Sequence, residues 1–214
     1  IAEAMRLLDA KASAVMKATA RTVFVSTAVS QSGRLDGLMV LVAQARMVWQ
    51  MAHIYTQRPS SADLLQLYAN VAATTFLVTE IEDLDIAEQM EPVITAALSG
   101  SLASVVPGVN VVAMMATNSI IEGTANAYLV LRVGLITQRY CGALEPFERK
   151  AARRGASMGA AALLGSIVLE AAGLVTRSIG HAAREAGVGT WESVVGGVAR
   201  GAGWVGAGLG SLKK

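Results

Sequence analysis

Apolar side chains between residues 38 and 55 recur at alternating spacings of three and four, and polar side chains fall on another face. The apolar positions are Leu38, Leu41, Ala45, Val48, Ala52 and Tyr55, and the polar ones are Arg46, Gln50, His53 and Gln57. This spacing predicts an amphipathic helix. Pro59 ends the helix because the residue before a proline disfavours helical dihedrals, and Ser60 or Ser61 can cap a second helix beginning near Ala62.

The longest uncharged stretch runs from Pro92 to Ile121 and covers 30 residues. About 20 apolar residues are enough to cross a bilayer as a helix, so this stretch is the strongest membrane signal in the chain. Pro107-Gly108 falls in its middle and predicts a hairpin. The first arm, residues 93–106, would be about 21 Å long at 1.5 Å per residue, which is shorter than a hydrocarbon core of about 30 Å. Re-entrant insertion and burial inside a bundle therefore remain alternatives to spanning.

Two further apolar segments follow this hairpin. The longer arm continues past Glu122 to Leu131 and is predicted to end at Arg132, and residues 155–176 form another apolar helix interrupted only by Glu170. The basic residues between these segments are Arg132, Arg139, Arg149, Lys150, Arg153 and Arg154. Because cytoplasmic loops carry an excess of Lys and Arg, this stretch is expected on the cytoplasmic side if its flanking segments insert.

Composition supports the same picture. Hydrophobic residues make up 53% of the 214-residue chain and charged residues 16%, whereas an average soluble domain carries about 25% charged residues. The 21 glycines suggest close helix contacts, for which the candidates are Gly123, Gly134, Gly155 and Gly159. The predicted fold is all-α, a membrane-associated helical bundle with a hydrophobic hairpin around Pro107-Gly108. It divides into a helical domain at residues 1–154 and an apolar helix with a glycine-rich tail at residues 155–214.

Charge and motifs exclude several classes of function. The net charge of +2 argues against a nucleic-acid partner. Cys141 is the only cysteine, which excludes an intramolecular disulfide and a cysteine-based zinc site. Neither a phosphate-binding GxxxxGK[ST] sequence nor an HExxH sequence occurs, so we expect no cofactor and no metal. Residues 1–21 form a charged helical pattern without a signal-peptide core, and since the chain begins at Ile1, a longer parent protein is expected.

An acidic run lies between the second predicted helix and the uncharged stretch. Its carboxylates are Glu80, Glu82, Asp83, Asp85, Glu88 and Glu91. Clustered carboxylates can bind calcium, but this run lacks the spacing of an EF-hand loop. Blocks of like charge are more typical of exposed or partner-docking surfaces, which is the favoured interpretation here.

Several polar residues stand in apolar surroundings and are candidate functional residues. The ionisable ones are Asp36, Arg46, Glu122, Arg132 and Glu170. At membrane depth such groups mark functional sites by default, although structural pairing in a protein core is the alternative. Asn118, Glu122 and Asn126 are four residues apart and share one helical face, so they could line a homo-oligomeric pore or form polar contacts between helices.

One stretch of the chain also matches the consensus sequence of a catalytic motif. Gly155-Ala-Ser157-Met-Gly159 fits the nucleophile-elbow string, and Ser157, Glu170 and His181 follow the triad order of that fold. An elbow needs a strand before its serine, and the preceding residues carry no strand pattern. A dinucleotide-binding string at residues 201–206 lies too close to the C-terminus to begin a βαβ unit. We therefore expect no enzymatic activity from this chain.

Two stretches resemble the YcjF-like family of bacterial membrane proteins, a domain of unknown function often encoded behind a small GTPase domain. Residues 28–59 are similar in their serine-rich turn, Leu-Asp pair and Ile-Tyr-x-x-Arg-Pro ending, and residues 123–141 in Gly-x-x-Asn-Ala-x-Leu, Arg-x-Gly and a terminal Cys. The resemblance implies a helical protein of the bacterial inner membrane, connected to nucleotide-driven partners. It implies no catalytic residues, and this chain has no GTP-binding motif.

The leading hypothesis is a non-enzymatic membrane module that contacts the lipid bilayer, self-associates through glycine-lined faces and anchors a cytoplasmic protein partner. A homo-oligomeric pore or transporter is the alternative, and a serine hydrolase built on Ser157 is a third and less favoured one.

Overall fold

The computed structural model describes residues 2–29, 33–56, 58–76, 95, 110–143 and 145–185. Within these residues the elements are all helices: α1 (Ala2–Val29), α2 (Gly33–Tyr55), α3 (Ser61–Phe76), α5 (Asn110–Gly142) and α6 (Arg149–Glu185). The all-α prediction is therefore confirmed for this part of the chain. The predicted hairpin around Pro107-Gly108, the acidic run at residues 80–91 and the glycine-rich tail lie outside the described residues.

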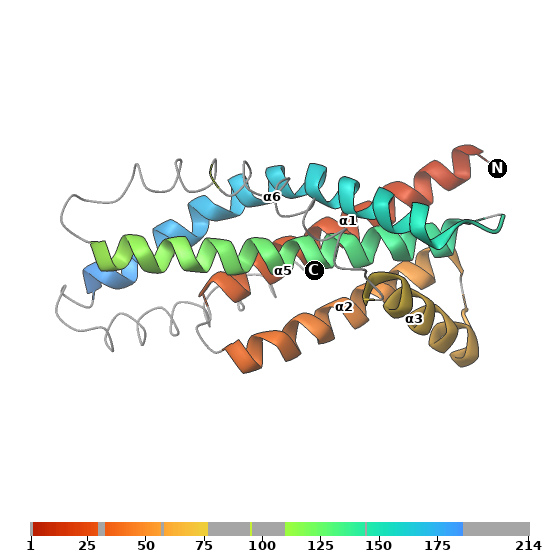
Figure 1. The fold of residues 1–214 in the computed structure, drawn as a ribbon, viewed down its shortest axis with the longest axis horizontal. Helices are drawn as coiled ribbons and strands as arrows, with labels where there is room; N and C mark the ends of the chain where they lie inside the picture. Colours follow the sequence, from red (N-terminus) through yellow and green to blue (C-terminus); the bar gives the residue numbers. More distant parts are fainter. Residues whose placement is uncertain are drawn as a thin grey trace, which may run out of the picture.

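The long helices form an elongated bundle in which consecutive helices alternate in direction (Figure 1). α1 and α5 make the most extensive contact, α6 packs on both, and α2 packs on the same pair. The short helix α3 packs mainly against α5. Helices α5 and α6 form a helical hairpin of their own, separate from the hairpin predicted around Pro107-Gly108. We call the end of the bundle where α5 leads into α6 the hairpin end. The first turns of α1 and the last turn of α2 also reach this end.

Local sequence signals explain where α3 begins. The Ser60 hydroxyl accepts a hydrogen bond from the Asp63 backbone N–H at 3.1 Å, and Asp63 Oδ2 accepts bonds from the Ser60 backbone N–H at 3.1 Å and from its hydroxyl at 2.6 Å. These bonds form a capping box. Because Ser60 donates to the carboxylate, the pKa of Asp63 is lowered. The predicted start near Ala62 is thus confirmed, with Ser60 as the cap.

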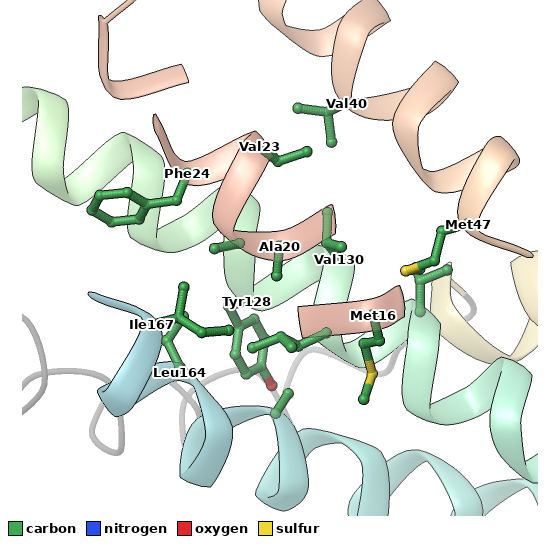
Figure 2. Close-up of a cluster of buried hydrophobic side chains, with 14 of the residues drawn as sticks. Met16, Ala20, Val23, Phe24, Val40, Met47, Tyr128, Val130, Leu164 and Ile167 are labelled. Carbon is green, nitrogen blue, oxygen red and sulfur yellow. The ribbon is translucent and has the colours of Figure 1, made fainter. Parts of the chain in front are cut away.

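A core of medium-sized aliphatic residues and alanines holds the long helices together. Figure 2 shows side chains from α1, α2, α5 and α6 converging on one cluster. Its largest fully buried members include Phe24, Met16, Met47, Ile120, Leu131 and Leu164. Alanines at positions 12, 20 and 28 of α1 are also buried, so this helix presents small side chains to its neighbours. Small residues let two helix backbones approach closely.

Three of the candidate packing glycines lie at helix crossings. A Cβ atom on Gly123 would lie 2.9 Å from the carbonyl oxygen of Phe24, and one on Gly134 would lie 2.5 Å from the sulfur of Met16. A Cβ atom on Gly159 would lie 2.9 Å from Cδ1 of Leu135. Gly155 differs, because nothing lies within 4 Å of its Cβ position. Within the described residues, no other helix therefore packs against Gly155.

The predicted boundaries of the last two helices were wrong. Helix α5 does not end at Arg132 but continues to Gly142, and Arg132 is buried inside the bundle with 6% of its surface exposed. Helix α6 begins at Arg149 and not at Gly155, so the proposed division at residues 154/155 falls inside a continuous helix. The predicted basic stretch is consequently divided between the end of α5 and the first turns of α6. A lone charge inside an apolar run did not mark a helix end, because the side chain is enclosed by neighbouring helices.

A hydrogen bond joins α2 to α1 at the hairpin end. The hydroxyl group of Tyr55 donates to Oδ1 of Asp9. Burial and the neighbouring Asp9 carboxylate both raise the pKa of Tyr55. The phenol therefore remains protonated and keeps its role as donor at neutral pH.

The glycine at the tightest backbone contact should resist even the smallest substitution. We expect Gly123→Ala to lower the free energy of unfolding by about 1 to 3 kcal/mol, because the new methyl group meets a backbone carbonyl that cannot move aside. The matched control is Gly165→Ala, which has open surroundings and should gain up to about 1 kcal/mol from helix propensity. Thermal unfolding of the three proteins in one solvent measures both changes. A stabilised Gly123→Ala variant would contradict the close contact between α5 and α1 at this position.

Alkaline titration should reveal the contact between Tyr55 and Asp9. A phenol whose pKa is raised in the folded state contributes stability that is complete below its ordinary pKa of 10 and is lost as the pH rises further. We expect the unfolding temperature of the wild type to fall more steeply above pH 10 than that of Tyr55→Phe. Tyr68→Phe is the comparison; burial alone raises the pKa of Tyr68, so its effect should be smaller. Equal pH profiles for wild type and Tyr55→Phe would refute the assignment.

Candidate functional site

A pocket of about 840 Å³ lies at the hairpin end, between the first turns of α1, the last turns of α5 and the first turns of α6. Its polar lining residues are Asp9, Gln138, Arg139 and Glu145, and its apolar ones include Met5, Leu135, Pro146, Phe147, Ala152 and Ala156. This volume lies within the range of pockets that hold small molecules. The mixed lining suits a ligand with both charged and apolar parts.

Aromatic and hydrogen-bonding contacts hold the charged groups of this pocket in place. The guanidinium carbon of Arg139 lies 5.4 Å from the ring centroid of Phe147, and Phe147 packs edge-on against Tyr140 with ring centroids 4.9 Å apart. The Asp9 carboxylate accepts the hydrogen bond from Tyr55 described above. One cation and one carboxylate of the pocket are therefore positioned by separate contacts.

Small residues on α6 leave this pocket open. The wall that α6 contributes consists of Ala151, Ala152, Gly155 and Ala156. The Cβ position of Gly155 has no neighbour within 4 Å, so a side chain there would project into free space. The glycine expected to pack against another helix instead forms part of the pocket wall.

A second, more open groove of about 570 Å³ lies between α1 and α2. Its lining includes Leu38, Met39 and Val42 of α2, which are about half exposed, together with Thr19 and Thr22 of α1. Arg46, a candidate polar residue placed on the polar face of its predicted helix, also lines this groove and is exposed.

The other candidate polar residues of α5 and α6 are mostly at the surface. Glu170 is 56% exposed at its side chain and forms an ion pair with Arg21 of α1 at 2.6 Å. Asn118 and Glu122 are exposed and Asn126 is half-buried, so this row lies at the surface of the described bundle and not in its interior. Of the candidate ionisable residues whose side chains are described, Arg132 alone is buried. The side chain of Asp36 lies outside the described residues.

The residues of the nucleophile-elbow match do not meet. Ser157, Glu170 and His181 all lie along α6, where no strand precedes the serine. The 24 residues between Ser157 and His181 correspond to about 36 Å along a helix. A triad needs hydrogen-bond contact between its members, so the hydrolase interpretation was wrong. Within the described residues, no three His, Cys, Asp or Glu side chains come together in an arrangement that could hold a metal ion.

Sequence reasoning missed Asp9, Gln138 and Arg21. Asp9 and Gln138 belong to helices far apart in the sequence, and only the packing of α1 on α5 brings them to one pocket. Arg21 and its partner Glu170 are separated by 149 positions. The signal in the sequence was local: small residues at positions 151, 152, 155 and 156 indicated that α6 leaves space there.

Two helical segments of the described chain are long and apolar enough to cross a membrane by length and composition, Asn118–Gly142 and Arg149–Val175. Their burial differs: the most apolar window of the first is 67% buried inside the bundle, and that of the second is 39% buried. A mostly buried apolar helix is also what the core of a soluble protein contains. The second segment therefore carries the stronger membrane signal.

The comparisons with known proteins agree with the sequence motifs. Residues 2–160 match the family described as "Domain of unknown function (DUF697)". A UPF0283 membrane protein of Allorhizobium ampelinum is 30% identical over 152 residues, which cover 71% of this chain and 36% of that protein. A UPF0283 membrane protein of Bradyrhizobium diazoefficiens is 35% identical over 71 residues, covering 33% of this chain and 21% of that protein.

No solved structure matches the chain. The matched regions span about a third or less of the length of these two relatives. The family match, in contrast, covers most of this chain, from the start of α1 into the first third of α6. The chain therefore belongs to the DUF697 family of domains of unknown function, which is the YcjF-like family that its motifs resemble.

Proposed function

We propose that this chain is a non-enzymatic helical membrane module in which α6 contacts lipid and the hairpin end faces the cytoplasm. The observation that carries the proposal is the outward face of α6. The apolar segment of this helix has a mean hydropathy of 1.9, yet most of that window is not covered by the bundle. Met158 and Leu169 are each 59% exposed and Leu174 is 48% exposed.

Helix α5 provides the internal comparison. Its apolar segment is enclosed by the other helices, so its hydropathy is accounted for by burial inside the chain. The outward face of α6 has no such cover among the described residues, and Glu170 is the only charged residue between Gly155 and Leu174. An apolar helical face of this length avoids water most readily by contacting acyl chains.

Charge at the hairpin end supports the proposed orientation. Arg149, Lys150 and Arg154 are exposed on the first turns of α6, immediately before the apolar face. Basic residues next to a membrane segment favour the cytoplasmic side. The two relatives are named membrane proteins, which supports the same environment for this chain.

The proposed role is to anchor a cytoplasmic protein partner. The relatives are about three times as long as the matched region or longer, so a module of this kind occurs together with further sequence. The association of the YcjF-like family with small GTPase domains suggests a nucleotide-driven partner. Self-association is part of the proposal, and it is restricted to outward surfaces, since Gly123, Gly134 and Gly159 already pack inside the chain.

Membrane partition tests the proposal directly. We expect the wild-type chain, expressed in bacteria, to stay in the membrane pellet after an alkaline carbonate wash. The double variant Met158→Lys/Leu169→Lys should leave the pellet, because each charge near the middle of a spanning helix costs about 2.5 to 3.5 kcal/mol. The fraction of protein in pellet and supernatant is measured by immunoblot.

The matched control is Leu7→Lys/Leu65→Lys, which changes two equally exposed leucines on α1 and α3. This variant should remain in the pellet, since neither position lies on the proposed lipid face. Recovery of the wild type as a soluble monomer would overturn the membrane role. Retention of Met158→Lys/Leu169→Lys in the pellet, or equal loss of both double variants, would contradict the assignment of the lipid-contacting surface to α6.

A further inference from the structure

We propose that the pocket at the hairpin end binds the headgroup of a zwitterionic phospholipid of the phosphoethanolamine type, with its acyl chains lying along the outward face of α6. The proposal rests on the proposed membrane function and names a ligand for that membrane face. Its basis is the combination of opposite charges in one pocket, two helix ends of opposite polarity and an apolar exit.

The phosphate side of the site is formed by Arg139 and the start of α6. The N-terminus of a long helix carries a partial positive charge and binds phosphate groups well. Residues 151 and 152, in the first turn of α6, line the pocket together with Arg139. The stacking of Arg139 on Phe147 orients the guanidinium group without using a carboxylate partner.

The ammonium side is formed by Asp9 and the end of α5. A Cβ atom on Gly142 would lie 3.9 Å from Oδ1 of Asp9, so this carboxylate lies against the last turn of α5. The C-terminus of a helix carries a partial negative charge and favours cations. Glu145, on the connection between α5 and α6, adds a second carboxylate to the lining. A primary ammonium group can donate hydrogen bonds to such acceptors.

The charged side chains that line the pocket favour a zwitterionic headgroup over a purely anionic or cationic one. The pocket lining contains one guanidinium group and two carboxylates. A purely anionic headgroup would meet two like charges, and a purely cationic ligand would leave Arg139 without its counter-charge. A headgroup with one phosphate and one ammonium satisfies both sides.

The apolar part of the pocket continues into the lipid face. Leu135 and Ala156 lie on the walls, and Gly155 belongs both to the pocket and to the exposed surface of α6. Met158 and Leu169 follow farther along the exposed side of α6 and are more than half exposed. Acyl chains leaving the pocket at Gly155 would therefore run along the surface that needs apolar cover.

Native mass spectrometry of the whole chain in detergent micelles measures the binding. The probes are dioleoyl phosphatidylethanolamine, dioleoyl phosphatidylglycerol and dioleoyl phosphatidylcholine, each titrated separately. We expect one phosphatidylethanolamine per chain, bound about tenfold more tightly than either of the other lipids, since only its headgroup offers both a phosphate and a hydrogen-bonding ammonium. Equal or stronger binding of phosphatidylglycerol would overturn the proposal.

Soluble glycerophosphoethanolamine separates the lipid from a free phosphate ester. Because it lacks acyl chains, it should compete about tenfold or more weakly than the lipid. Competition at equal concentration would show that the pocket recognises the soluble ester, and the acyl-chain part of the proposal would be wrong.

Filling the pocket tests its location. Gly155→Leu places a side chain in the open space of the wall and should weaken phosphatidylethanolamine binding by at least about tenfold, while the higher helix propensity of leucine preserves α6. Gly165→Leu is the matched control, since that glycine also has open surroundings but does not line the pocket; its binding should equal that of the wild type. Unchanged binding of phosphatidylethanolamine by Gly155→Leu would overturn the proposed site. The same conclusion holds if this variant changes only the oligomeric state.

Arg139→Gln tests the charge of the site. Because the side chain of Arg139 is exposed, this variant should fold as the wild type does, and it should bind phosphatidylethanolamine and phosphatidylcholine more weakly alike, since both headgroups carry the phosphate assigned to Arg139. Unchanged binding of phosphatidylethanolamine in Arg139→Gln would contradict the role of the guanidinium group. Carbonate partition of Gly155→Leu distinguishes the lipid site from the membrane role. A variant that stays in the pellet but loses phosphatidylethanolamine binding supports both proposals. A soluble wild type contradicts the membrane role, whatever the pocket binds.

Discussion

The close approach of α1 to α5 is the constraint on which the rest of the structure depends. Gly123 and Gly134 let α5 lie directly against Phe24 and Met16 of α1. A Cβ atom on Gly123 would meet the backbone carbonyl of Phe24, and one on Gly134 would displace the side chain of Met16. Helices α2 and α6 each pack against both members of this central pair. A wider separation of α1 and α5 would therefore displace both outer helices and open the pocket that α1, α5 and α6 share.

Packing on this central pair places two apolar helices in different environments. Helix α5 is largely surrounded, so most of its apolar residues and even Arg132 lie inside the bundle. Helix α6 packs on the pair with one side only and leaves Met158, Leu169 and Leu174 outward. A hydropathy window alone cannot separate these situations, because it averages over both sides of a helix. The separation needs the exposed fraction of each side chain, which the packing determines.

The features that could be predicted from the sequence are those that depend on interactions between residues close together in the chain. Pro59 and Ser60 placed the break before α3, because capping acts within a few residues. Helical spacing predicted the helix α2 but not its buried face: Leu38 and Leu41 of the predicted apolar face are exposed, whereas Met47 is buried against the other helices. The end of α5 was misplaced at Arg132, since α5 continues past this residue to Gly142 and the neighbouring helices enclose its side chain. The pocket and the Arg21–Glu170 pair were not predictable in the same way, because each depends on the register between helices that are distant in sequence.

The ion pair between Arg21 and Glu170 has a specific consequence for a membrane orientation. Glu170 lies 16 residues beyond Arg154, which corresponds to about 24 Å along α6. In the proposed orientation, this distance places Glu170 within a hydrocarbon core of about 30 Å. An unpaired carboxylate at that depth would oppose insertion of α6. Arg21 supplies the counter-charge from α1 at 2.6 Å, so the two helices together present a neutral pair where α6 alone would present a charge. The contact of α1 with α6 is thus what makes the single acidic residue of this apolar segment compatible with a lipid-facing position.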